Sequence, residues 1–221
     1  MAIAPAPRIS LAGSGALLID GAQGRFDDTV QELVWAVAEA AKALDGVRET
    51  VPGMNNLLVL FDPLVTNASI VGEHLQSLWA VTDPQAVPGT VHRIPVIYGG
   101  ARGEDLAGWA AHCGLSLEER VNRHVAATYS VAAIGAMPGF PYLSGLDPRL
   151  TWPRRESPRL KVAEGAVVIG GAQAGVMPMT APSGWHIIGH TDVRLFDIEA
   201  QSQVLLRPGD KIRFEIAGIE E

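Results

Sequence analysis

The chain has 221 residues, of which 48% are hydrophobic and 19% charged, so it can bury a full core and a disordered protein is excluded. Seventeen basic and 24 acidic side chains give a net charge of -7, which excludes nucleic acid as the main partner because phosphate binding needs a basic surface. With one cysteine, no signal peptide and no apolar run long enough for a membrane helix, we expect a cytoplasmic protein without an internal disulfide or a membrane partner.

The first part of the chain predicts a small α/β domain over residues 1–88. Apolar residues at helical spacing run from Val30 to Leu44, and Asp27 or Asp28 can cap this helix. A second helix is expected from about Ser69. Short strands are expected at residues 8–12, 16–19, 47–51 and 57–61. Residues 82–90, rich in Pro and Gly, form the expected linker.

The second part, residues 89–221, predicts short helices followed by a small β-barrel or sandwich, so the fold class is α+β. Ser116 and Glu119 form a capping box and predict that a helix begins there. An apolar stripe from Leu106 to Cys113 predicts another helix just before it. Strands are expected at 94–98, 167–169, 185–188, 193–196 and 211–216, a pattern of short strands and turns that is typical of barrels.

The segment from Met137 to Leu143 contains two prolines and predicts a rigid loop rather than a strand. This loop can hold the rings of Phe140 and Tyr142 as walls of a pocket. Packing of the same aromatics on the barrel, as ordinary core residues, is the alternative interpretation.

Five cationic side chains lie within thirteen residues of this acidic chain and are stiffened by three prolines. They are Arg149, Arg154, Arg155, Arg159 and Lys161. Arginine presents a planar fork that matches a carboxylate or phosphate in two hydrogen bonds. The cluster therefore predicts an anion site, and a solvated basic patch is an equally good interpretation.

Glycines and histidines elsewhere in the barrel region carry weaker signals. Residues 170–175 match neither the G-x-G-x-x-G nor the P-loop pattern, so their glycines indicate a close approach of the backbone to a neighbouring group. Gln173 in this segment can contact a ligand or stabilise a turn. His186 and His190 are about 13 Å apart along a strand, too far to share one ion, and we predict no metal site. His124 lies on the inward face of a capped helix, where a general base and a core histidine are both possible.

Several motifs resemble the allophanate hydrolase subunit 1 family, which includes the B subunit of 5-oxoprolinase and a sporulation-kinase inhibitor. The motifs span most of residues 94–216 and occur in the order that the family uses. They are Ile94–Gly100, Pro138–Leu143, Gly145–Leu150, Pro153–Arg155, Ser157–Arg159 and Gly184–Trp185.

This resemblance implies an α/β domain followed by a cyclophilin-like β-barrel. It implies a hydrolase subunit, inactive alone, that opens the cyclic amide 5-oxo-L-proline to L-glutamate with ATP. The ATP would be shared with two partners, the family's subunit 2 (or C) and a third lactam-utilisation-type subunit.

Residue roles also follow from the resemblance. It implies a catalytic role for His124, and the substrate-binding candidates are Tyr98, Phe140, Tyr142, Arg154, Arg159 and Gln173. An arginine would hold the substrate carboxylate or a phosphorylated intermediate, and the aromatic rings would exclude water.

The chain also departs from the family pattern. Ala174 and Met177 stand where the family commonly has Thr and Tyr. A urea-type amidase or carboxyltransferase subunit therefore remains an alternative function, and a non-catalytic inhibitor of a histidine kinase is another.

Overall fold

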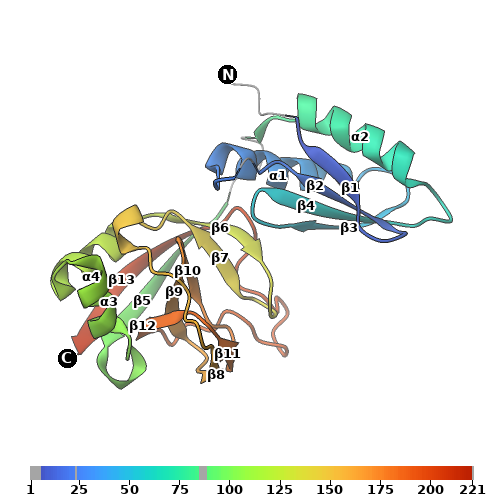
Figure 1. Cartoon of the computed structure of the whole chain (residues 1–221). Coiled ribbons are helices and arrows are strands. Elements are labelled where there is room, and N and C mark those ends of the chain that lie inside the picture. Colours follow the sequence, from blue (N-terminus) through green and yellow to red (C-terminus); the bar gives the residue numbers. More distant parts are fainter. Residues whose placement is uncertain (1–5, 23, 85–88, 221) are drawn as a thin grey trace. The chain divides into compact units, whose positions relative to one another are not determined.

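The computed structural model describes residues 6–22, 24–84 and 89–220, and the chain divides into two compact units, Met1–Pro88 and Gly89–Glu221. The predicted linker, residues 82–90, includes residues 85–88, which lie outside the described residues. Within the described ranges, no helix is long and apolar enough to cross a membrane. The units contain both helices and strands, which confirms the α+β class (Figure 1).

The first unit is a four-stranded antiparallel sheet with two helices. The strands lie in the order β1-β2-β4-β3, and the helices contact both the sheet and each other. The elements are β1 (Arg8–Leu11), β2 (Ala16–Asp20), α1 (Asp28–Ala41), β3 (Val47–Pro52), β4 (Asn56–Phe61) and α2 (Ala68–Val81). They enclose a core of their own, in which Val34, Val37 and Leu57 are fully buried.

Both helices of this unit begin at a side-chain cap. The Asp27 carboxylate accepts hydrogen bonds from the N–H groups of Thr29 and Val30, which confirms the first of the two predicted caps. Asn67 caps α2 in the same way. Each cap satisfies backbone donors that have no partner inside the helix.

The second unit is a closed barrel with the strand order β10-β7-β6-β13-β5-β12-β9 (Figure 1). Adjacent strands of this barrel pair antiparallel, except β5 and β13, which pair parallel along their length. The barrel strands are β5 (Val91–Gly99), β6 (Tyr129–Ile134), β7 (Pro141–Ser144), β9 (Ala166–Gly170), β10 (Gln173–Val176), β12 (His186–His190) and β13 (Lys211–Glu220). A separate two-stranded sheet pairs β8 (Arg159–Val162) with β11 (Ala181–Ser183).

Helices α3 (Leu106–Cys113) and α4 (Leu117–Ala126) connect β5 to β6. The predicted capping box is confirmed, because the Ser116 hydroxyl accepts from the Glu119 N–H while the Glu119 carboxylate accepts from the Ser116 N–H. Short 3-10 turns, η2 (Gly100–Arg102) and η3 (Pro148–Leu150), complete this unit. The two helices seal the barrel core, so that Trp109 and Val121 are fully buried.

Two predictions of local structure are wrong. Residues 141–143 belong to strand β7 instead of a loop, and Pro141 is tolerated there because it is the first residue of the strand. Residues 193–196 form no strand, and their only ladder contact is an isolated bridge between Phe196 and Val204. The apolar side chains of these residues predicted a strand, but a strand also needs a partner strand, and the sequence pattern does not show whether one is present.

Candidate functional site

A cavity of about 300 Å³ opens in the barrel unit. Four parts of the chain line it, namely the turn before β7 with its first residues, the arginine-rich segment before β8, the residue after β10, and the end of β11 with the turn that follows it. The lining residues are Ala136, Met137, Phe140, Tyr142, Arg154, Arg155, Pro158, Met177, Pro182, Ser183, Gly184 and Trp185.

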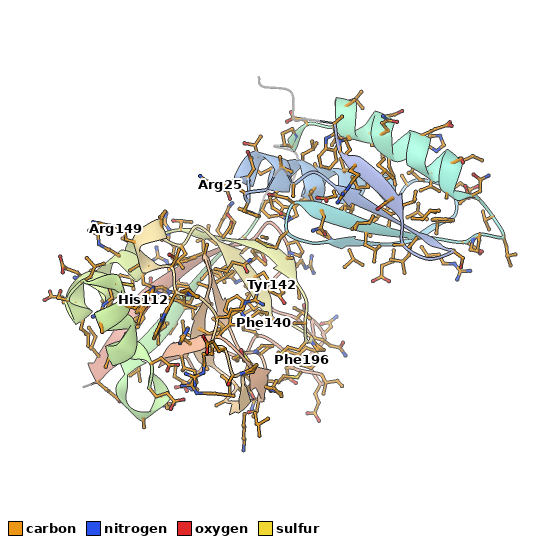
Figure 2. The ribbon with its side chains drawn as sticks, in the orientation of Figure 1. Arg25, His112, Phe140, Tyr142, Arg149 and Phe196 are labelled. Atoms are coloured by element: carbon orange, nitrogen blue, oxygen red, sulfur yellow. The ribbon has the colours of Figure 1, made fainter. Side chains whose placement is uncertain are left out.

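One wall of the cavity is aromatic. Phe140, Tyr142 and Trp185 meet edge to face, with ring centroids 5.1, 5.4 and 6.1 Å apart, an arrangement that aromatic rings prefer. Figure 2 labels the first two rings, which lie next to each other. A Cβ atom on Gly170 would lie 2.5 Å from the Trp185 ring, so a glycine is required for this ring to lie against β9.

The cavity is cationic. Arg154 and Arg155 line it, and its described lining contains neither Asp nor Glu. The Arg154 guanidinium lies over the Trp185 ring, 5.2 Å from its centroid, and is exposed. Among the described residues, no carboxylate lies within ion-pair distance of Arg154. The aromatic wall and two arginines whose positive charges are poorly balanced by nearby carboxylates favour a small anion as the ligand.

Arg155 is held more firmly than Arg154. Its N–H donates to the Gly184 carbonyl at 2.8 Å, which ties the arginine segment to the turn before β12. Its Nη1 lies 3.7 Å from the Asp105 Oδ1. The sequence places Arg155 in the cationic cluster but does not distinguish it as a binding residue.

Arg159, a predicted substrate-binding residue, does not line the cavity. Its guanidinium pairs with Glu104 and with Asp105, each at 2.8 Å. The hydrogen bond to Asp105 raises the pKa of Arg159 above its usual value. Because two carboxylates already compensate its charge, its direct role in binding stays a prediction that the geometry does not favour.

His124 and Tyr98 lie together in the barrel core and are fully buried. The Tyr98 hydroxyl and His124 Nδ1 share a hydrogen bond of 2.8 Å, and the Tyr129 hydroxyl donates to the His124 carbonyl at 3.0 Å. Burial lowers the pKa of His124 to about 3 and raises the pKa of Tyr98. Neither residue lines the cavity, so a catalytic His124 and a substrate-binding Tyr98 stay predictions.

Gln173 begins β10 and is half-buried. It pairs with Gly170 across the β9–β10 hairpin and does not line the cavity. The structure therefore brings together Phe140, Tyr142 and Arg154, and it places the other four predicted site residues elsewhere.

Two residues at the cavity were not predicted from the sequence: Trp185, which lines it, and Asp105, which contacts Arg155 and Arg159 behind its wall. The sequence did point to Trp185, because it follows Gly184 in one of the family motifs, but the resemblance implied no role for it. Asp105 had no signal, because its side-chain partners lie 54 and 82 residues away along the chain.

The described residues contain no group of three or more His, Cys, Asp or Glu side chains that could hold a metal ion. His186 and His190 lie at opposite ends of β12. His186 Nε2 donates to the Pro153 carbonyl at 2.8 Å, and His190 Nε2 lies 3.2 Å from Asp192.

The sequence matches the family model described as carboxyltransferase domain, subdomain C and D, over residues 7–206. It is 44% identical to the B subunit of 5-oxoprolinase from Escherichia coli O157:H7 over 184 residues, which are 83% of this chain and 84% of that relative. It is 41% identical to the B subunit of 5-oxoprolinase from Haemophilus influenzae, covering 86% of this chain and 89% of that one. These findings confirm the resemblance inferred from the motifs.

The structure is also similar to the crystal structure of TTHA0988. The TM-score is 0.79 at 32% identity, and the match covers 93% of this chain. It covers 40% of the TTHA0988 chain, so the present chain spans less than half the length of that protein.

Proposed function

The chain belongs to the carboxyltransferase-domain family, subdomains C and D, and we propose that it is the B subunit of an ATP-dependent 5-oxoprolinase. The observation that carries this proposal is the identity of 41–44% with two proteins of that name, over more than four-fifths of each chain. The reaction is the ring opening of 5-oxo-L-proline to L-glutamate.

The barrel cavity supports a substrate of this kind. 5-Oxo-L-proline is small, carries one carboxylate and has a flat lactam ring, and a cavity of about 300 Å³ is at the lower end of small-molecule sites. We assign its carboxylate to Arg154, whose charge has no carboxylate partner among the described residues. We assign its ring to the wall formed by Phe140, Tyr142 and Trp185, which shields one face of the lactam from bulk water.

The lining of this cavity also favours a chain that needs partners. Its hydroxyl groups belong to Tyr142 and Ser183, and the Ser183 Oγ accepts a hydrogen bond from the Trp185 N–H at 3.2 Å. Of the residues that the structure describes, no histidine or carboxylate lines it, so the general base for water attack must come from elsewhere. The family's C subunit and a third, lactam-utilisation-type subunit are the partners that we propose as its source.

When bound by the complex, ATP supplies the driving force for opening a stable lactam. We place the complex in the cytoplasm, where ATP is available. The contribution of this chain is to bind and orient the substrate, which supplies catalysis through proximity.

Replacement of the resident protein in cells tests the proposal. An Escherichia coli O157:H7 strain without its own B subunit should regain growth on 5-oxo-L-proline as nitrogen source when this chain is expressed. The Arg154→Ala variant should fail to restore growth. Arg149→Ala, which removes an exposed arginine of the same cluster outside the cavity, should restore it.

Failure of the unmodified chain, although it copurifies with the resident partner subunits, would contradict the proposal. Turnover of urea by the same complex would instead support the urea-type alternative. Met177 lines the cavity where the family commonly has Tyr, and together with Ala174 it keeps this alternative open.

A further inference from the structure

The Asp105 carboxylate lies just behind the cavity wall and joins two of its segments. Asp105 precedes α3, its side chain is 12% exposed, and it does not itself line the cavity. Withdrawing most of a carboxylate from water is costly unless its oxygens have partners, so the contacts of Asp105 indicate what it holds in place.

One oxygen of Asp105 holds the arginine-rich segment. Oδ1 accepts a hydrogen bond from Arg159 Nη2 at 2.8 Å and lies 3.7 Å from Arg155 Nη1. These two arginines bracket Pro158, which lines the cavity together with Arg154 and Arg155. The negative charge of Asp105 therefore attracts the arginine-rich segment at two positions, Arg155 and Arg159.

The other oxygen of Asp105 holds the strand that follows Trp185. Oδ2 accepts the Ile187 N–H at 2.7 Å, and the Asp105 N–H donates to the Ile187 carbonyl at 2.9 Å. Ile187 is two residues after Trp185, so this double contact fixes the backbone that carries the aromatic wall.

We infer that Asp105 is a positioning residue that sets the distance between the cationic and aromatic walls and aims the Arg155 guanidinium into the cavity. The inference rests on the proposed function, because it concerns the same substrate site. Arg159 has a second carboxylate partner in Glu104, at 2.8 Å. The Arg155 Nε donates to the Ser157 carbonyl at 3.4 Å, and among the described residues Asp105, at 3.7 Å, is the carboxylate near its charge. Arg155 is therefore the arginine whose direction depends on Asp105 and whose charge remains available to an anion.

The Asp105→Asn variant keeps the size of the side chain and an oxygen for the Ile187 N–H, but it removes the negative charge. Its amide N–H groups then face the guanidinium groups of Arg155 and Arg159. In the reconstituted complex, KM for 5-oxo-L-proline should rise about tenfold or more, with kcat changed by less than about threefold. Binding of the ground state and of the transition state is weakened equally, because Arg155 stands beside Arg154 in the cationic wall and attracts the substrate carboxylate throughout the reaction.

Asp147→Asn is the matched control. Asp147 also precedes a helical turn in the same unit and pairs with an arginine, Arg123 at 3.1 Å, but its partners Arg123 and Arg149 do not line the cavity. Its KM should equal that of the unmodified chain. Asp105→Glu restores the charge and should recover most of the lost affinity.

A double-mutant cycle separates positioning from general support of the fold. If Asp105 acts through Arg155, Asp105→Asn should raise KM in the unmodified background and leave it unchanged in an Arg155→Ala background. Equal factors in the two backgrounds would overturn the inference, as would an unchanged KM in Asp105→Asn itself.

Hydrogen exchange of the purified chain decides the inference even if the assembled complex shows no turnover. Amides of residues 154–157 and of Ile187 should exchange faster in Asp105→Asn than in Asp147→Asn. Equal exchange in the two variants would overturn the positioning role. A complex that assembles without turning over 5-oxo-L-proline would contradict the proposed function alone.

Discussion

Acidification should destabilise the barrel unit through His124, because this side chain is buried as the neutral imidazole. It is fully buried, shares a hydrogen bond with the Tyr98 hydroxyl through Nδ1, and stacks on Phe214 with ring centroids 4.6 Å apart. Burial lowers its pKa from 6.5 to about 3 in the folded protein. A group whose folded pKa is depressed destabilises the fold as the pH falls below the unfolded pKa, since only the unfolded chain takes up the proton.

The size of the effect follows from these two pKa values. At pH 7 both states are mostly unprotonated and the effect is small. At pH 5 the unfolded histidine is protonated and the folded one is not, which lowers the free energy of unfolding by on the order of 2 kcal/mol relative to pH 7. This figure depends almost entirely on the unfolded pKa, because any folded pKa below about 4 gives the same result.

Urea unfolding at pH 7 and pH 5, for the unmodified chain and for His124→Asn, measures this contribution as a difference between the two proteins. The contributions of all other titrating groups cancel in this difference. Between pH 7 and pH 5 the free energy of unfolding should fall less in His124→Asn than in the unmodified chain, by on the order of 2 kcal/mol. Because the variant leaves a cavity against Phe214, the NMR signal of the His124 ring serves as a second measurement. It should not move between pH 8 and pH 5 in the folded chain, and it should titrate near pH 6.5 in concentrated urea. A folded His124 that titrates near pH 6.5 would refute this reasoning and favour an accessible general base.

Three further results are expected. Arg154→Ala should raise KM for 5-oxo-L-proline by about tenfold or more, the loss of one charge-assisted contact, while Arg149→Ala leaves steady-state kinetics unchanged; equal kinetics in both would contradict the anion site. Gly170→Ala should lower the free energy of unfolding by about 1–3 kcal/mol in urea titrations and weaken substrate binding, since its Cβ would displace the Trp185 ring; an unchanged KM would argue against this wall. The Cys113 thiol should react with iodoacetamide at pH 8 more slowly than free cysteine, because burial raises its pKa, and equally fast alkylation would show that the thiol is accessible.

Local signals in the sequence were sufficient for the helices. The caps at Asp27 and Ser116 are set by residues two or three positions away, so the sequence alone identifies where α1 and α4 begin. Residues 141–143 were harder, because Pro-Gly-rich sequence is typical of loops. Pairing with β6 along residues 141–144, and with β10 at Leu143, turns these residues into a strand.

The candidate site was predictable only where its residues are neighbours in the chain. Phe140, Tyr142 and Arg154 came from motifs and do line one cavity. Asp105 could not be found, because its contacts with Arg159 and Ile187 exist only after the barrel closes. For His124 the sequence pattern was ambiguous. A histidine on the inward face of a helix has the same spacing whether it lines a binding site or is buried in the core.

ATP-dependent release of glutamate from 5-oxo-L-proline, measured with the purified chain alone and then with its two partner subunits, shows whether this chain is a subunit of a 5-oxoprolinase. We predict no turnover by the chain alone and turnover by the mixture, which disappears when this chain is left out. A mixture that demonstrably assembles but releases no glutamate would contradict the account.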